Sequence, residues 1–238
     1  MIPKKLYRYR SHLLRYAGEF VIIFSSITFT WWFDEWRQER TDRASEALIL
    51  RNLNANLKID SLNLDAELSY ILKVDLTFDE FLEKLKTGQL SDADSSGFLI
   101  RRLIIAPEFH PNKATFEGIK STGELKLIEE DSLAQAIMNL YEVSYQELDF
   151  LIDVYNRTSI ETIWNYAIEN HDLEKVLGMP GDRIYKLNFK SDEDRRMLIN
   201  KIRFTQMAVT YSTIRIQGTL EKISLVRYRI RKRLEELT

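Results

Sequence analysis

The chain has 238 residues, of which 45% are hydrophobic and 29% charged, with 8 Gly, 4 Pro and no Cys. The lack of cysteine excludes disulfides, thiolate metal sites and cysteine nucleophiles. Few helix-breaking residues and many Leu, Glu, Lys and Arg predict an all-α fold of long helices.

The formal net charge of -2 conceals a gradient along the chain. Five basic residues and no acidic residue precede Tyr16, which leaves 29 of the 34 Lys and Arg against all 36 Asp and Glu in the remainder. A basic head on an acidic body is typical of a membrane anchor rather than of a nucleic-acid binder. We therefore expect a lipid bilayer as a partner and no nucleic acid.

An uncharged apolar run extends from Phe20 to Phe33. As a helix it would rise only about 21 Å, which is short of the roughly 30 Å of a hydrocarbon core. Extending it back to Leu13 supplies the missing length and includes Arg15 and Glu19, which share a helix face and can pair. The sequence thus predicts a transmembrane helix at 13–33, preceded by a basic cytoplasmic head at 1–12.

Trp31, Trp32 and Trp36 mark the far end of this run, and tryptophan collects at membrane interfaces. The alternatives are a buried helix of a soluble protein and a cleaved signal peptide, but no small-residue cleavage motif follows the run. We interpret it as an uncleaved, single-pass anchor.

Orientation follows from Lys and Arg alone. Five precede the span, and Arg37, Arg40 and Arg43 follow it. This bias predicts a protein of the bacterial inner (cytoplasmic) membrane, with its N-terminus in the cytoplasm and its body in the periplasm.

Residues 34–238 are expected to form an α-helical extracytoplasmic domain. Apolar residues at three-four spacing predict helices within 34–86, one of them beginning anew at Thr77, and a long helix at 131–170. Between them, 91–123 is interpreted as a short-helix insertion with helices at 98–106 and 113–122, the second capped by Gly123. An extended connector at 178–189 precedes the last helix.

The last helix, 192–237, has the clearest pattern. Branched residues recur every seven positions and predict a bundle or oligomer seam: Ile202, Val209, Ile216, Ile223 and Ile230. A helix of this length needs partners along its whole course. The helices at 34–73 and 131–170 would make an elongated antiparallel bundle, and identical neighbours in an oligomer are the alternative.

Two blocks carry a family resemblance. The stretch "YAGEFVIIF…WWFDEWRQER" resembles the start of a family of uncharacterised bacterial single-pass membrane proteins, and Thr115–Tyr141 resembles that family's second block, in which a Ser-x-Gly turn joins two helices. The chain lacks a residue before Gly18 and has Trp31-Trp32 where the family tends to have Asn. The resemblance implies the same topology and carries no activity.

Glu19 is the most suggestive single residue, because an ionisable group at membrane depth is a functional hypothesis by default. In an oligomer it would line a proton or cation path; otherwise it is an interfacial carboxylate paired with Arg15.

The turn near Gly123 offers a second site. It is either a recognition turn or a corner that packs on the long helices, and its residues are Phe116, Ile119, Ser121, Gly123 and Leu125.

Other chemistry has little support. "DADSSG" at 92–97 resembles a calcium loop, but its twelfth position is Leu103 in place of glutamate. The three histidines are scattered, and there is no phosphate-binding loop or nucleophile elbow. No metal, cofactor or catalytic residue is expected.

The leading hypothesis is a non-enzymatic, membrane-anchored helical scaffold or accessory subunit of a cell-envelope complex, working as a homo-oligomer or within a larger membrane protein complex. The alternatives are a ligand-sensing periplasmic bundle and an oligomeric ion-conducting or motor-associated protein that uses Glu19. An enzyme is the weakest hypothesis.

Overall fold

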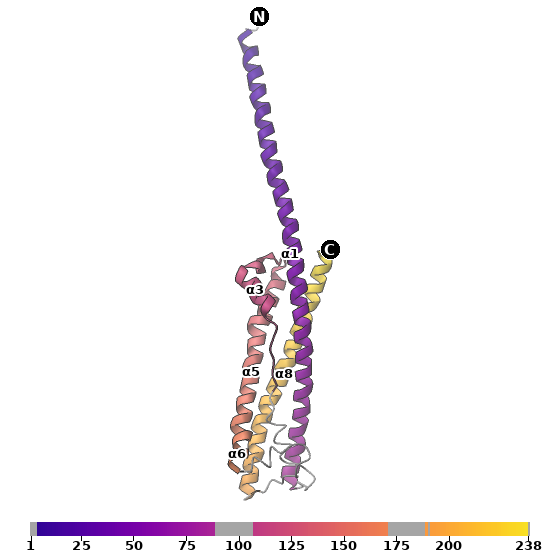
Figure 1. Ribbon diagram of the computed structural model, residues 1–238, viewed down its shortest axis with the longest axis vertical. Coiled ribbons are helices and arrows are strands. Elements are labelled where there is room, and N and C mark those ends of the chain that lie inside the picture. The colour runs from indigo at the N-terminus through magenta and orange to yellow at the C-terminus, as the bar shows by residue number, and fades with distance from the viewer. Residues whose placement is uncertain (1–3, 89–106, 171–188, 190, 238) are drawn as a thin grey trace.

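A computed structural model describes residues 4–88, 107–170, 189 and 191–237, with side chains from residue 18 onward. Within these ranges the secondary structure is helical, as the composition predicts. Three long helical segments lie side by side and form a bundle: α1 (Lys4–Thr87), the segment at 131–170, and α8 (Asp192–Glu236) (Figure 1). The N-terminal part of α1 extends far beyond one end of this bundle.

The direction of the helices follows from the contacts between them. Along α1, Asn54 and Asp75 meet Arg227 and Gln206 of α8, so these two helices are antiparallel. Ser144 and Thr162 meet Lys222 and Thr205 of α8, so the segment at 131–170 also runs antiparallel to α8 and is parallel to α1 (Figure 1). The expected antiparallel bundle is therefore correct for α8 against each neighbour and wrong for the other two segments with respect to each other. A parallel pair needs a return of the chain along the bundle.

Helix α1 is continuous through Thr77, where a new helix was predicted to begin. The Thr77 hydroxyl donates to the carbonyl of Lys73 one turn back, as an interior helix residue does, and its side chain is buried. A capping-box spacing does not interrupt a helix whose next turns bury Phe78 and Phe81. The prediction of a separate helix there was wrong, whereas the end near Gly88 is confirmed by its left-handed φ of 68°.

The segment at 131–170 is one unbroken helical path with two π-helical turns. It consists of α4 (Asp131–Asn139), η2 (Leu140–Ser144), α5 (Tyr145–Ser159), η3 (Ile160–Trp164) and α6 (Asn165–Asn170). Each π turn shifts the register of the helix, and residues on both sides of η2, among them Tyr141, Tyr145 and Leu148, are buried in the core. The described path is helical from Asp131 to Asn170, as predicted, and its two π turns were not foreseen.

Helix α8 begins at a cap, because the Ser191 hydroxyl accepts a hydrogen bond from the Asp194 backbone amide at 3.2 Å. The predicted seam lies in the core of the bundle, with all five branched residues at most 1% exposed: Ile202, Val209, Ile216, Ile223 and Ile230. Small residues on the alternate track, Thr205, Ser212 and Thr219, are buried with them. The seam is thus filled by this chain's own helices.

The residues between 113 and the start of α4 form a short corner at one end of the bundle. It contains α3 (Ala114–Thr122) and the 3-10 turn η1 (Glu124–Leu127), separated by Gly123 at φ 73°. The predicted helix and its glycine cap are confirmed. The predicted helix at 98–106, the loop at 91–97 and nearly all of the connector at 178–189 lie outside the described residues.

The seam supplies the first test of this fold. Replacing Ile216 with Ala is expected to lower the free energy of unfolding by about 2–4 kcal/mol, because it leaves a cavity in the core. The matched change at Ile59, which is 49% exposed on α1, is expected to cost less than about 0.5 kcal/mol. Chemical denaturation followed by circular dichroism compares the two variants, and equal losses would contradict the assignment of these faces.

Candidate functional site

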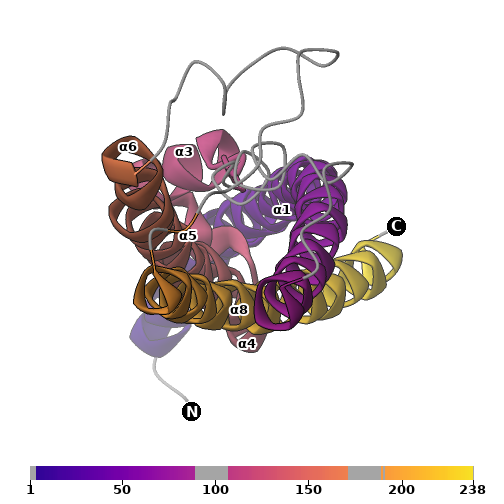
Figure 2. The same ribbon diagram turned by 90° about the horizontal axis from the view of Figure 1, so that it is seen from below.

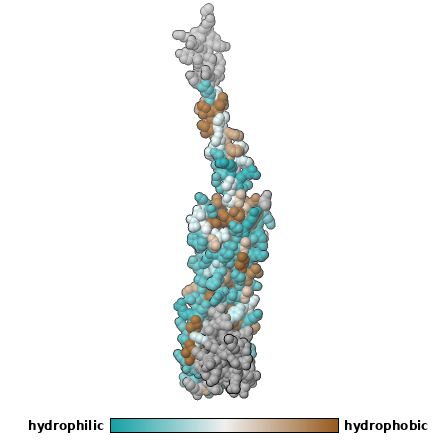
Figure 3. All heavy atoms as spheres, viewed as in Figure 1, coloured by the Kyte–Doolittle hydropathy of each residue, from teal (hydrophilic) through white to brown (hydrophobic). Residues whose placement is uncertain are grey.

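The first candidate site is the exposed apolar segment of α1, defined here as residues 20–33. It stands clear of the bundle and forms a hydrophobic band on the projecting helix (Figure 3). Its large side chains are half to two-thirds exposed, from 46% at Phe33 to 68% at Ile22. Contiguous apolar surface of this kind marks a binding site for another protein or for lipid.

Three of the four hydroxyl side chains of this segment are satisfied within the helix. Ser26, Thr28 and Thr30 donate to backbone carbonyls one turn back, at distances of 2.8–2.9 Å. Such bonds leave no hydroxyl proton in need of water. These three positions therefore interrupt the apolar character of the segment less than their residue types imply.

The C-terminal end of the segment is aromatic and then charged. Trp31 and Trp32 are 66% and 59% exposed, and Trp36 packs at 5.8 Å from Phe33, measured between ring centroids. The Arg40 guanidinium lies 4.9 Å from the centre of the Trp36 ring, within the range of a cation–π contact. Charged surface begins at Asp34, directly after Phe33.

Glu19 and Arg15 both lie in α1, four residues apart and hence on one helix face. Glu19 is exposed, and the side chain of Arg15 is outside the described part. When the hydropathy of the described helices is averaged, none of them reaches the length and apolar character that crossing a membrane demands.

The second candidate site is the charged end of the bundle where α1 enters it. Glu46 on α1 is buried, and its carboxylate accepts hydrogen bonds from the Arg233 side chain at 2.9 and 3.0 Å and from the Glu129 backbone amide at 3.2 Å. Arg233 also pairs with the Glu129 carboxylate, and these bonds raise its pKa above the ordinary value. One arginine thus connects α8, α1 and the corner before α4.

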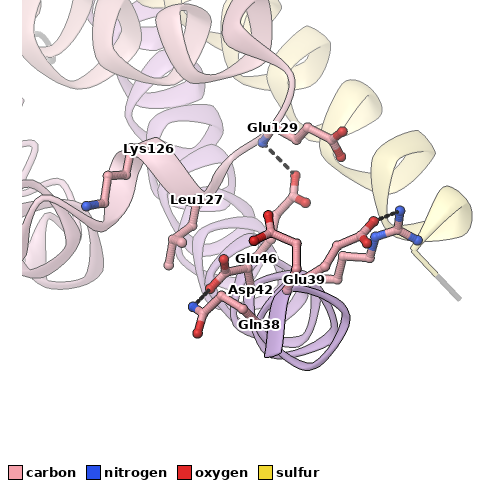
Figure 4. A pocket seen from close by; sticks show the side chains of 9 residues that line it. Gln38, Glu39, Asp42, Glu46, Lys126, Leu127 and Glu129 are labelled. Carbon is pink, nitrogen blue, oxygen red and sulfur yellow. Dashed lines mark hydrogen bonds and ion pairs between the residues drawn. The ribbon is translucent and has the colours of Figure 1, made fainter. Parts of the chain in front are cut away.

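A groove of about 270 Å³ opens beside this cluster, between α1 and η1. Figure 4 shows Glu39, Asp42 and Glu46 on one wall, with Lys126 and Leu127 opposite. The acidic side chains have partners: Asp42 accepts from Gln38 at 2.9 Å, and Glu39 pairs with Arg43 at 2.7 Å. The groove therefore lies at a seam between elements, and Glu39 and Glu46 on its wall are each paired with an arginine.

The third candidate is a buried carboxylate in the middle of the bundle. Asp60 is fully buried, and it accepts hydrogen bonds from the Asn112 backbone amide at 2.9 Å and from the Tyr145 hydroxyl at 2.8 Å. Burial raises the pKa of its carboxyl, and the two hydrogen bonds offset part of that rise. The Phe109 and Tyr141 rings pack edge-to-face against the Tyr145 ring, at 5.4 and 5.1 Å between ring centroids.

Glu67, two turns further along α1, has a similar position. It accepts a hydrogen bond from the Glu108 backbone amide, and burial raises its pKa as well. The two acidic residues that interrupt the apolar seam of α1 thus bind the backbone of the returning segment. In the sequence they appear only as acidic residues within the apolar track of this helix.

The turn near Gly123 packs as a corner. Phe116 and Ile119 are buried, with the Phe116 ring stacked on Tyr141 at 4.5 Å, and Leu125 is partly buried against the same core. The Ser121 hydroxyl donates to the Gly118 carbonyl. Ser121 and Gly123 are the exposed members of the five, so recognition by this turn stays a prediction that concerns them alone.

Metal chemistry gains nothing from the described residues, where no group of three or more His, Asp or Glu side chains is placed to hold an ion. The weak calcium-loop motif at 92–97 is outside those residues. Comparison of the chain with protein-family models, with curated proteins and with solved structures gave no match.

The raised pKa of Asp60 predicts a pH dependence. Because the folded state holds this proton more tightly than the unfolded state does, the contribution of Asp60 to stability is full below about pH 4 and is lost as the pH rises through the folded-state pKa. The variant Asp60→Asn keeps an acceptor for the Asn112 amide and does not titrate. The stability of this variant relative to the unmodified chain is expected to increase from about pH 4 up to the folded-state pKa of Asp60. Above that pKa the difference is expected to level off.

Denaturant titrations at pH 4, 5, 6 and 7 measure this difference. Asp65→Asn, at an exposed position of the same helix, serves as the control and is expected to leave the pH profile unchanged. A difference between Asp60→Asn and the unmodified chain that stays constant with pH would contradict the burial of the charge.

Proposed function

We propose that this chain is a single-pass membrane protein in which residues 13–33 of α1 lie in the bilayer. The bundle would then serve as a non-enzymatic scaffold or accessory subunit of a cell-envelope complex. The observation that carries the proposal is the apolar surface at residues 20–33, which the bundle leaves uncovered on a helix that continues into it.

The energetic argument is one of transfer from water. At about 25 cal/mol per Å² of apolar surface, eleven large side chains exposed at 20–36 make a hydrated segment costly. Residues 13–33 would span about 31 Å as a helix, which matches a hydrocarbon core. The internally bonded hydroxyl groups and the tryptophans at one end are what such a span requires.

Glu19 and Arg15 are compatible with this placement because they lie within the first two turns of the span. An arginine there extends toward the head groups, and a carboxylate one turn away on the same face can pair with it. The resemblance of residues 16–40 and Thr115–Tyr141 to single-pass bacterial membrane proteins agrees with the same topology.

The scaffold role rests on how α1 joins the proposed membrane span to the bundle. The helix is continuous from Lys4 to Thr87, so the proposed span and the bundle share one rigid element. Arg233, Glu46 and Glu129 fix that element to α8 and to the corner where it enters the bundle. A body attached in this way keeps a set attitude to the membrane, which suits the positioning of partners.

Membrane attachment is tested by fractionation. Ile23→Arg with Ile27→Arg is expected to shift most of the full-length protein from the membrane pellet to the supernatant, because two charges at the centre of a span oppose insertion. The matched control is Leu62→Arg with Leu76→Arg, which alters residues of similar exposure on the bundle part of α1. The control should stay in the pellet after carbonate washing. An unmodified chain found in the supernatant without detergent would refute the proposal.

Orientation is tested with single cysteines, for which the cysteine-free chain gives no background. Lys58→Cys, on the bundle, is expected to react with a membrane-impermeant maleimide in intact spheroplasts. Ser11→Cys is expected to react only after the membrane is permeabilised. The reverse pattern would place the body in the cytoplasm and overturn the five-to-three reading of the flanking charges.

A further inference from the structure

Helix α8 has a second row of large side chains on its solvent side, which we call the outer stripe. These residues follow each other at intervals of three and four and are 56–59% exposed, apart from the glycine and glutamate among them: Phe204, Met207, Tyr211, Ile214, Gly218, Glu221, Leu225 and Tyr228. This is the spacing of a coiled-coil seam sustained over more than three heptads. A helix face that is exposed only to water does not need such a row of apolar side chains.

The outer stripe lies opposite the core of the bundle. Each of its main positions follows a buried seam residue by two, as Phe204 follows Ile202, and two residues turn an α-helix through about 200°. The flanks of α8 are occupied: Gln206 contacts α1, and Arg215 contacts α5 through Glu147. Seen from below, α1 and α5 lie beside α8 (Figure 2). Because the contacts of Gln206 and Arg215 mark the flanks of α8, the outer stripe between them faces away from both neighbours.

Gly218 supplies an independent observation. It lies in the interior of a 45-residue helix, where glycine costs about 1 kcal/mol relative to alanine. A Cβ at this position would meet no atom within 4 Å, and its φ is not positive, so this chain's own fold gives no reason for a glycine. A gap in the middle of an apolar stripe is what the close approach of another helix would use.

We propose that the outer stripe is the surface through which two copies of this chain pair, with α8 of one copy packed in parallel against α8 of the other. Six large side chains, each leaving roughly 100 Å² in water, offer roughly 600 Å² per copy, near the ~800 Å² per partner of a standard interface. The parallel direction rests on the proposed function, because two chains anchored in one membrane point the same way.

The flanks of the outer stripe permit this pairing. On one side the residues are Arg203, Thr210, Gln217 and Ser224, of which only Arg203 is charged, and in a parallel, in-register pair it lies across from the uncharged Ala208. On the other side, Arg215 and Arg229 pair with Glu147 and Glu130 of their own bundle at 3.2 and 2.6 Å. Between them, the Lys222 ammonium donates to the Ser144 hydroxyl at 2.8 Å. Two copies can thus approach without repulsion along the edges of the stripe.

Glu221 is the exception and sharpens the test. In a parallel, in-register pair it meets its own counterpart, and like charges at such a position are destabilising. Glu221→Leu is therefore expected to lower the dissociation constant of the dimer several-fold. A weaker dimer would overturn the parallel register, because in the opposite direction Glu221 would face the Tyr211 hydroxyl instead.

The oligomeric state of the full chain in a mild detergent tests the surface directly, by light scattering with correction for the micelle. The unmodified protein is expected to be a dimer, and Ile214→Asp to have half that protein mass. Ile160→Asp, a matched change at a residue 50% exposed on η3, should remain dimeric. A monomeric unmodified protein that still pellets with membranes would overturn this inference and leave the proposed anchor intact.

Single cysteines decide the direction of pairing in native membranes. Phe204→Cys and Tyr228→Cys are each expected to form a disulfide-linked dimer with mild oxidant, because identical positions face each other in a parallel pair. Phe150→Cys, 65% exposed on α5, should not. Cross-linking of 204 to 228 when the two variants are mixed, without same-residue products, would show an antiparallel pair. Loss of the dimer in Leu62→Asp but not in Ile214→Asp would assign the interface to α1.

Discussion

The bundle depends on polar side chains of α1 that hold the backbone of the returning chain. Because α1 and the segment at 131–170 are parallel, the polypeptide must travel back along the bundle, and a segment without regular structure has backbone amides to satisfy. Glu67 accepts from the amide of Glu108, and Asp60 accepts from that of Asn112. Asn56 then donates to the Thr115 hydroxyl. Asp60 and Glu67 thus replace apolar residues at two positions of the α1 seam. Their contacts with the returning chain help to place the segment at 131–170 in the bundle.

The cost of this arrangement falls on Asp60. A buried carboxylate is expensive to desolvate, and two hydrogen bonds recover only part of the loss, as the raised pKa of the group indicates. The Tyr145 hydroxyl that completes the site comes from the first residue after η2. The π turn η2 therefore lies directly before the residue that faces Asp60.

Periodicity predicted the parts of the fold that repeat. The seam of α8 was identified residue by residue, because Ile202 and its successors hold one spacing for the length of the helix. The π turns were missed, since a single inserted residue leaves three-four spacing locally plausible on both sides. The false break at Thr77 came from a local cap motif that the burial of Phe78 and Phe81 overrides.

The candidate sites were less accessible from the sequence. Helix α8 carries two apolar rows, and only the core seam was recognised in the sequence. The residues of the core seam are uniformly branched, whereas those of the outer stripe differ in size and chemistry and so form a less obvious repeat. Asp60 and Glu67 gave a signal, as acidic residues within an apolar track, but their partners are backbone amides. A sequence pattern does not show which backbone amides a side chain will bind. Neither the contacts of Asp60 and Glu67 nor the direction of the segment at 131–170 could therefore be derived from it.

The unbroken course of α1 has a mechanical consequence. From Phe33 to Thr87 the helix runs for about 80 Å, and its side chains are fixed in the bundle from Glu46 onward. If residues 13–33 lie in a bilayer, as proposed, a tilt of the helix by about 10° there moves the far tip at Thr87 by about 14 Å. With no hinge to absorb the swing, the whole body has to follow it.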